Sequence, residues 1–232
     1  MNRIRIITAA IVVLLAGTTL VHAQGAGIEW DILNQEVMDL HQQGNYDRAV
    51  VVAQKALEVA KENVGPDHPN VATSLYNLAA LYDTQGDDAK AEPLFKRSLA
   101  IREKALGPDH PNVATSLNNL AALYDTQGDY AKAEPLYKRS LAIVEKALGP
   151  DHPNVAASLN NLAALYKTQG DYAKAEPLFK RSLAIWEKAL GPDHPNVATS
   201  LENMAVLYRA TKRDKEAQEL EKRAERIRAI KR

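Results

Sequence analysis

Cysteine is absent from all 232 residues of this chain, which excludes disulfide bonds, thiol nucleophiles and a lipid-modified N-terminal cysteine. The sequence also has no glycine-rich phosphate loop, and its His, Asp and Glu residues cluster only at one repeated corner. No catalytic constellation is therefore present. The sequence predicts a protein that is not an enzyme and that carries no cofactor.

Charge of one sign is not in excess either, because 29 basic residues balance 29 acidic ones. Without residues 1–23 the balance is 27 to 29, a net charge of −2. A chain without a basic surplus gives no support for nucleic acid as a partner, and none for a polybasic membrane patch. The partner that we expect is a protein or a peptide.

A long apolar run occurs only near the start of the chain. Arg3 and Arg5 precede the run at 6–21, and Val21-His22-Ala23 fits a small-x-small cleavage pattern. The run falls short of the roughly 20 residues that span a bilayer as a helix. We therefore expect a signal peptide cleaved after Ala23 and an exported protein, either periplasmic or secreted, with no stable membrane insertion. A membrane anchor formed by 6–21 is the alternative.

The rest of the chain is dominated by a repeat of 42 residues. The hexapeptide at Gly107 to Asn112 recurs at 65–70, 149–154 and 191–196, and the copies that begin at Gly65 and Gly107 differ at only four positions. Self-similarity at this period is typical of stacked arrays of small units. The mature chain is therefore expected to be one array, at 24–232.

One copy of the repeat has the pattern of two helices. Its first half places apolar residues at helical spacing from Val113 to Tyr124, and its second half does so from Ala133 to Leu141. Gly128 is expected to end the first helix and Asp129 to cap the second. Small residues such as Ala121 and Ala133 fall where the two helices would cross. Each repeat is therefore predicted to be a helix-turn-helix unit.

Pro135 lies about six residues into the expected second helix, where a proline removes a hydrogen bond and bends the helix. Its counterparts are Pro93 and Pro177. Either the helix is kinked at a regular position in each repeat, or it starts later in the sequence.

This arrangement resembles the tetratricopeptide repeat (TPR). The family's pattern of apolar, small, aromatic and glycine positions is matched by Leu117, Leu120, Ala121, Tyr124, Gly128, Tyr130, Ala133 and Tyr137. The period of 42 and the segment 133–136 resemble the repeats of kinesin light chains. The resemblance covers essentially the whole mature chain. It implies an all-α fold, a right-handed superhelical solenoid of five helix-turn-helix units, whose first helices line a concave surface.

The five expected repeats are not equivalent. The first is divergent, and the fifth has lost the turn glycine to Lys212 and an aromatic residue to Glu221. The end of the fifth is strongly charged, which is typical of the polar cap that closes a solenoid. The expected repeats are 28–64, 69–106, 111–148, 153–190 and 195–230.

The resemblance places the candidate peptide-binding residues on the first helices. Side-chain amides donate and accept at once, so they can hold a peptide backbone without demanding a sequence. A column of asparagines has this chemistry, with Gln35 in the matching place of the first repeat: Asn77, Asn119, Asn161 and Asn203. The alternative is that these amides pair internally with neighbouring backbone, or that duplication simply copied them.

Two further columns vary between the copies. One contains Tyr76, Asn118, Asn160 and Glu202. The other changes sign along the array and contains Asp83, Asp125, Lys167 and Arg209. Such a charge gradient would orient a ligand of opposite polarity. The alternative is a solvated face with drifting charges, since exposed charges usually contribute little.

One histidine per repeat lies between Asp and Pro at the corner: His68, His110, His152 and His194. A metal site needs several ligands at one point, and a single-file array keeps these residues apart. We expect structural corner residues and no metal site.

Two functions from different classes follow from the sequence. The first is a non-catalytic, exported scaffold that binds a peptide or protein partner in its groove. The second is a structural array that forms a homo-oligomer through its repeats or end faces, without a peptide ligand.

Overall fold

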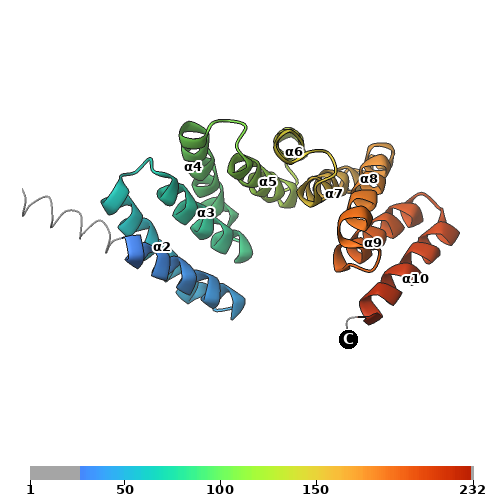
Figure 1. Cartoon of the computed structure of the whole chain (residues 1–232), viewed down its shortest axis with the longest axis horizontal. Helices are drawn as coiled ribbons and strands as arrows, with labels where there is room; N and C mark the ends of the chain where they lie inside the picture. The colour runs from blue at the N-terminus through green and yellow to red at the C-terminus, as the bar shows by residue number, and fades with distance from the viewer. Residues whose placement is uncertain (1–26, 231–232) are drawn as a thin grey trace, which may run out of the picture. The chain divides into compact units, whose positions relative to one another are not determined.

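The computed structural model describes residues 27–230, and Figure 1 shows them as a succession of helix pairs. The expected signal peptide at 1–23, its cleavage after Ala23 and the anchor alternative at 6–21 lie outside these residues. No strand occurs between residues 27 and 230. No helix of the described part is both long and apolar enough to cross a membrane. The chain divides into two compact units, 1–105 and 106–232, and each is described by itself.

Unit 1 contains two helix pairs. A helical segment at 27–42 is followed by α2 (Tyr46–Val64), and α3 (Pro69–Thr84) is followed by α4 (Asp88–Leu106), whose last residue belongs to the second unit. The core joins both pairs and includes Val37, Val71 and Leu75. Trp30 packs against this core and donates from Nε1 to Ser74 Oγ at 2.8 Å, which ties the first pair to the second.

Unit 2 contains three helix pairs. They are α5 (Pro111–Thr126) with α6 (Tyr130–Leu148), α7 (Pro153–Thr168) with α8 (Tyr172–Leu190), and α9 (Pro195–Ala210) with α10 (Asp214–Ile230). First helices of 16 residues alternate with second helices of 17 or 19. The apolar stripe of each helix is buried against its neighbours, as it must be for helices that cannot bury it alone.

Local signals set the turn within each pair. Gly128 has φ of +76°, a left-handed conformation that glycine adopts without strain, and it follows the end of α5. Asp129 then caps α6, because its side chain accepts from the backbone N–H of Lys132. Both expectations from the sequence are confirmed. In the fifth repeat Lys212 replaces the glycine and still takes a positive φ of 61°.

The corner between pairs is built around the repeated histidine. His152 Nδ1 accepts from the backbone N–H of Asn154 at 3.1 Å, and Pro153 occupies the first turn of α7. The other three corners repeat this cap at the same distance, with His68, His110 and His194. The histidines are therefore N-caps, which is a structural corner role. No group of three or more His, Cys, Asp or Glu that could hold a metal ion occurs in the described part of the chain.

Small and hydroxyl side chains join the two helices of a pair. Ala121 and Ala133 are fully buried, and Ser140 Oγ donates to the carbonyl oxygen of Ala114 at 2.8 Å. Ser98 and Ser182 make the same bond in their own repeats, at 2.7 Å. Each buried serine is thus satisfied by the backbone of the preceding helix, so these serines hold helices together.

Pro135 lies inside α6, and the helix begins at Tyr130. The alternative of a helix that starts after the proline is therefore wrong. Ala133 and Lys132 already donate to the Asp129 backbone carbonyl, so the turn forms before the proline is reached. The proline removes only the one bond that residue 135 would donate four residues back.

The last pair of unit 2 closes its outer side with ion pairs. Arg209 donates to Glu221 at 2.8 and 2.6 Å, and Arg228 donates to Glu202 at 3.2 and 3.0 Å. Glu221 stands where earlier repeats have the buried Phe95, Tyr137 or Phe179. The charged residues of this pair thus bond to one another where earlier repeats have a buried aromatic residue.

The close crossing at Ala133 makes a stability prediction. Ala133→Leu should overpack the α5–α6 interface and destabilise the protein by about 1–3 kcal/mol, because this side chain is fully buried. Ala131→Leu is the matched control, since Ala131 is exposed on the same helix. Urea unfolding followed by circular dichroism measures both. Equal midpoints for the two variants would contradict the packing argument.

Candidate functional site

The asparagine column lies on the first helices, half-buried, and its amides pair from one repeat to the next. In unit 1, Asn77 Nδ2 donates to Asn34 Oδ1 at 2.9 Å. In unit 2, Asn161 donates to Asn118 at 2.9 Å, and Asn203 donates to Asn160 at 3.2 Å. We call these three bonds the amide ladder. The partners in these three bonds are side chains 43 residues apart. Asn34 Nδ2 in addition donates to the neighbouring backbone carbonyl of Trp30 at 2.7 Å.

The ladder positions each amide without exhausting it. A side-chain amide has two donor hydrogens and one carbonyl oxygen, and a ladder bond uses one donor of one residue and one acceptor of the other. Within one repeat, Asn119 Oδ1 accepts from Nδ2 of Asn118 at 3.3 Å. Amide groups that the ladder bonds hold in fixed positions therefore lie at the junctions between first helices.

Two hollows lie beside the ladder in unit 2. The α5–α7 hollow has a volume of about 380 Å³, with Asn118 and Asn161 on its wall and Val144 and Leu148 among its apolar lining. The α7–α9 hollow has a volume of about 250 Å³ and is lined by Asn160, Asn161, Trp186, Asn196, Thr199 and others. The hollows share Ala157 and Asn161, so they are immediate neighbours.

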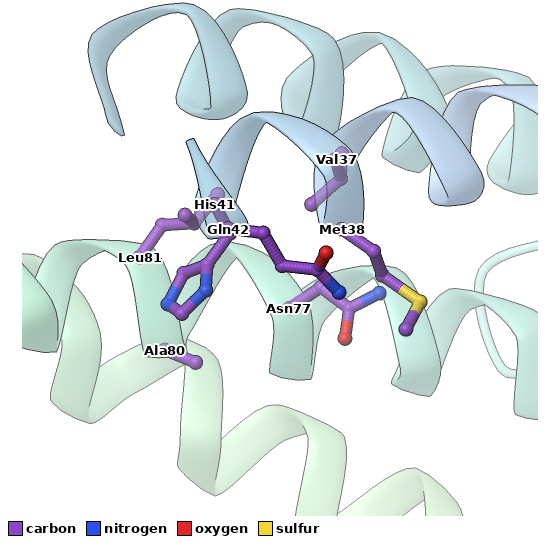
Figure 2. Close-up of a pocket in the computed structure, with 7 residues that line it drawn as sticks. All are labelled: Val37, Met38, His41, Gln42, Asn77, Ala80 and Leu81. Atoms are coloured by element: carbon purple, nitrogen blue, oxygen red, sulfur yellow. The ribbon is translucent and has the colours of Figure 1, made fainter. Parts of the chain in front are cut away.

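Unit 1 has a smaller pocket, which lies toward the C-terminal ends of its first helices. The hollows of unit 2 lie toward the N-terminal ends of theirs. Figure 2 shows the seven lining residues of the unit 1 pocket, which come from the segment 27–42 and from α3. Asn77, Gln42 and His41 supply the polar groups, and Met38 extends along one side. The volume is about 160 Å³. Its size suits one small side chain.

The column that changes sign lies near the C-terminal ends of the first helices. Asp83 and Asp125 are half-buried, and this burial raises the pKa of both carboxyl groups, with a smaller contribution from Asp88 at Asp83. Arg209 is held by Glu221 and, at 3.5 Å, by Asp214. The positive end of this column is thus partly neutralised within the last pair, whereas Lys167 lies half-buried on α7.

Tyr76 belongs to a cluster inside unit 1. Its ring lies 5.7 Å from that of Phe95 in an edge-to-face arrangement, and the Arg102 guanidinium lies 4.9 Å from its centroid. Burial lowers the pKa of Arg102, although the Tyr76 side chain opposes this effect. Tyr76 therefore differs from Asn118 and Asn160, which line the hollows.

Sequence reasoning missed several residues of this site. Asn34 was overlooked because Gln35 occupies the aligned position, yet the recurrence of asparagine at 34, 118 and 160 was a usable signal. Val144 and Trp186 were missed as lining residues because only the first helices were expected to line the concave surface. Both come from second helices and line the hollows together with the asparagines.

The junction between the last two pairs contains a strongly perturbed carboxylate. Glu176 accepts from Arg213 at 2.9 and 3.0 Å and from Tyr208 at 3.2 Å, and it pairs with Lys180 at 2.7 Å. Hydrogen bonds from Lys180 and then Arg213 lower the pKa of Glu176 from 4.5 to about 2, against the opposing effect of burial. Folding therefore favours the ionised carboxylate here.

A pH dependence follows from this shift. The unfolded chain binds a proton near pH 4.5 that the folded chain binds only near pH 2, so Glu176 stabilises the fold above pH 4.5 and loses this effect between pH 4.5 and 2. Glu176→Gln should destabilise by about 1 kcal/mol at pH 7, and the difference should shrink below pH 4.5. Urea midpoints across pH measure it, with Glu219→Gln on the exposed face as control. A difference that stays constant down to pH 2 would contradict the assignment.

Comparisons with known proteins agree with this geometry. The family model described as "Tetratricopeptide repeat" matches residues 31–104, 85–146, 126–188 and 161–229. No curated protein sequence matches the chain significantly. A solved putative kinesin light chain from Podosopora anserina, with nearly identical TPR-like repeats, is 28% identical over 87% of this chain and 96% of its own, with a TM-score of 0.74.

Two further solved structures share the fold at lower identity. BtubC (BKLC) from P. vanneervenii is 24% identical over 91% of each chain, with a TM-score of 0.74. The Pseudomonas aeruginosa protein pilF is 22% identical over 87% of this chain and 78% of its own, with a TM-score of 0.63. The expected all-α solenoid of helix-turn-helix units and the resemblance to kinesin light chains are confirmed. The chain belongs to the tetratricopeptide repeat family.

Proposed function

We propose that this protein is a non-catalytic, exported scaffold that binds an extended segment of a partner protein along the first helices of unit 2. TPR folds typically mediate protein–protein interaction, and proteins built from them are generally non-catalytic scaffolds. The observation that carries the proposal is the pair of adjoining hollows beside the amide ladder.

The chemistry of the hollows suits a polypeptide. Amides at their walls can bond to a peptide backbone in either direction, because each amide both donates and accepts. Apolar side chains such as Val144 and Trp186 lie deeper and offer contact area to side chains. An extended segment would satisfy its backbone on the walls and bury alternate side chains between them.

The asparagine column has one of two roles in this proposal. Asn161 lines both hollows, and Asn77 lines the pocket of unit 1, so both stand where a ligand would lie. Asn203 supports the neighbouring amide of Asn160 through the ladder. A ligand would thus contact some of the amides directly. The other amides would hold those contacting amides in position through the ladder bonds.

Site-specific photo-crosslinking tests the proposal. A photoreactive residue at Ala157, which is exposed between the hollows, should trap the partner in cells that make the full chain. The same residue at Ala173, exposed on α8 and outside both hollows, is the control. Mass spectrometry of the adduct then identifies the bound segment. Equal adducts at both positions, or crosslinks only between copies of this chain, would contradict the proposal.

The location is a separate part of the proposal and rests on the sequence at 1–23. Export with cleavage after Ala23 predicts a mature protein that begins at Gln24. Mass determination of the purified protein, together with fractionation of the cells, measures this directly. A protein that keeps its first residues and sediments with membranes would support the anchor alternative instead.

A further inference from the structure

Consecutive repeats are so similar that the few positions at which they differ stand out. The copies beginning at Gly65 and Gly107 differ at four positions, and in the first of them three lie in one cluster: Tyr76, Phe95 and Arg102. The differences between these copies are thus gathered in space rather than scattered over the surface.

The next comparison within the chain places two of its four differences at the hollows. The copies beginning at Gly107 and Gly149 differ at Thr115/Ala157, Asp125/Lys167, Tyr137/Phe179 and Val144/Trp186. The first and last of these pairs line the hollows of unit 2. Random drift in near-identical copies would fall mostly on exposed positions away from any site, because there substitutions have little effect on stability.

Two columns that vary along the array lie 26 residues apart, one on the first helix and one on the second, and we call their two residues in each repeat the variable pair. It is Tyr76 with Arg102, Asn118 with Val144, Asn160 with Trp186, and Glu202 with Arg228. The first-helix member is asparagine in both middle repeats, so only the second-helix member differs between them. The first pair stacks at 4.9 Å, and the last is ion-paired at 3.0 Å. The two middle pairs line the α5–α7 hollow and the α7–α9 hollow respectively.

We propose that the middle variable pairs determine which side chains the protein accepts: the α5–α7 hollow takes a bulky uncharged side chain, and the α7–α9 hollow takes a small uncharged one. This inference rests on the proposed function, because it assigns two subsites for an extended peptide. The ligand class is therefore an uncharged stretch of polypeptide with one large and one small apolar residue close together.

The lining of the hollows excludes charged ligands. Although a quarter of all residues in the chain are charged, no charged residue lines either hollow. A charged side chain placed there would lose its water without gaining a counter-ion, which is unfavourable. Asn, Ser and Thr around the rim can instead satisfy the peptide backbone on either side of an apolar side chain.

The size of the ligand side chain that each hollow accepts follows from the second-helix member of its variable pair. Val144 leaves about 380 Å³ in the α5–α7 hollow, whereas the larger Trp186 leaves about 250 Å³ in the α7–α9 hollow. The Trp186 side chain is only 9% exposed, so its indole is packed in place and offers a flat apolar surface. A small side chain or a proline ring suits that surface.

The next variable pair marks where the uncharged stretch ends. Arg228 donates to Glu202 and, at 2.9 Å, to Thr199 Oγ1, and Thr199 lines the α7–α9 hollow. The hollow is thus bordered by a guanidinium that is already satisfied. We expect the ligand residue beyond the small side chain to be polar.

Exchange of the residues between repeats tests the proposal, because Val and Trp both occur naturally at this position of the framework. Val144→Trp should reduce the α5–α7 hollow, and Trp186→Val should enlarge the α7–α9 hollow. Random 12-residue peptides displayed on phage would be selected separately on the full chain and on each variant. Circular dichroism verifies that helicity is equal, and Trp186→Phe makes the same test with a smaller change if Trp186→Val unfolds.

The three selections have distinct expected results. The unchanged chain should enrich peptides with one bulky and one small apolar residue, Val144→Trp should enrich two small residues, and Trp186→Val two bulky ones. Peptides selected on the unchanged chain should bind either variant about tenfold more weakly, the usual effect of a mismatch in an apolar pocket. These outcomes do not depend on the direction in which the peptide runs.

Other results would overturn either the inference or its foundation. An identical consensus on all three proteins would show that the variable pairs do not set specificity. The proposed function, peptide binding over the first helices, would still hold. Failure of the unchanged chain to enrich any peptide would overturn the proposed function together with the inference. Charged residues in the consensus at the two subsites would contradict the assigned ligand class.

Discussion

Phe179→Ala is expected to destabilise unit 2 by about 3–5 kcal/mol, the range for removing a buried phenylalanine. The Phe179 side chain is 0% exposed in α8. Its column holds Phe95, Tyr137 and Phe179 and then changes to Glu221 in the last pair. Phe179 is thus the last aromatic residue of this column, because the aligned position in the last pair is Glu221.

The loss should appear first in the last helix pair. In stacked repeats each pair contacts mainly its neighbours, so stability is a sum of repeat and interface contributions. A cavity in α8 weakens the interface that holds α9 and α10, the last helix pair of the described residues. Limited proteolysis should therefore cleave Phe179→Ala after α8 before any other segment, and urea unfolding should begin earlier.

Leu190→Ala is the matched control for this prediction. Leu190 lies on the same helix but its side chain is 39% exposed, so truncation should destabilise the protein by less than about 1 kcal/mol. Urea unfolding followed at 222 nm measures both variants against the unchanged protein. If the two substitutions moved the midpoint equally, the aromatic column would not carry the packing assigned to it.

The helices could be predicted from the sequence because their limits depend on local signals. Gly128 and Asp129 act within a few residues of themselves, and the corner at 149–153 does the same. Repetition then presents each signal several times. The close crossing at Ala121 and Ala133 could also be predicted, since only small residues permit it.

The amide ladder could not be predicted in the same way. Alignment of the copies at a period of 42 identifies equivalent residues, whereas contacts join residues that are not equivalent. The rotation of one pair against the next brings position 161 to position 118, a separation of 43. The sequence therefore showed which asparagines recur and not which asparagines touch.

The charged column illustrates a second limit. Its change of sign is visible in the sequence, but the effect of each charge depends on partners elsewhere in the chain. Arg209 is matched by Glu221, which lies twelve residues away on the next helix. The acidic end is altered too, because burial raises the pKa of Asp125. Pairing with distant residues and burial determine how strongly the charges of this column would act on a ligand. Neither can be read from the local spacing of residues in the sequence.

Ala157→Trp is expected to weaken peptide binding about a hundredfold, the largest effect on function that we predict. Ala157 lines both hollows and is exposed, so an indole at this position would occupy the space of two subsites at once. Loss of two apolar contacts of about 1–3 kcal/mol each corresponds to this factor. Fold stability should change little, because an exposed alanine side chain makes no packing contact that tryptophan would break.

Fluorescence anisotropy with a labelled peptide, selected on the unchanged chain, measures this affinity. Ala173→Trp adds the same side chain at an exposed position of α8 outside both hollows, so it should bind the peptide as the unchanged chain does. Equal weakening by both substitutions would indicate a general effect of the added tryptophan, and full affinity of Ala157→Trp would place the peptide elsewhere. Because Ala157 takes part in neither the ladder nor the core, a selective loss would be due to occupation of the hollows alone.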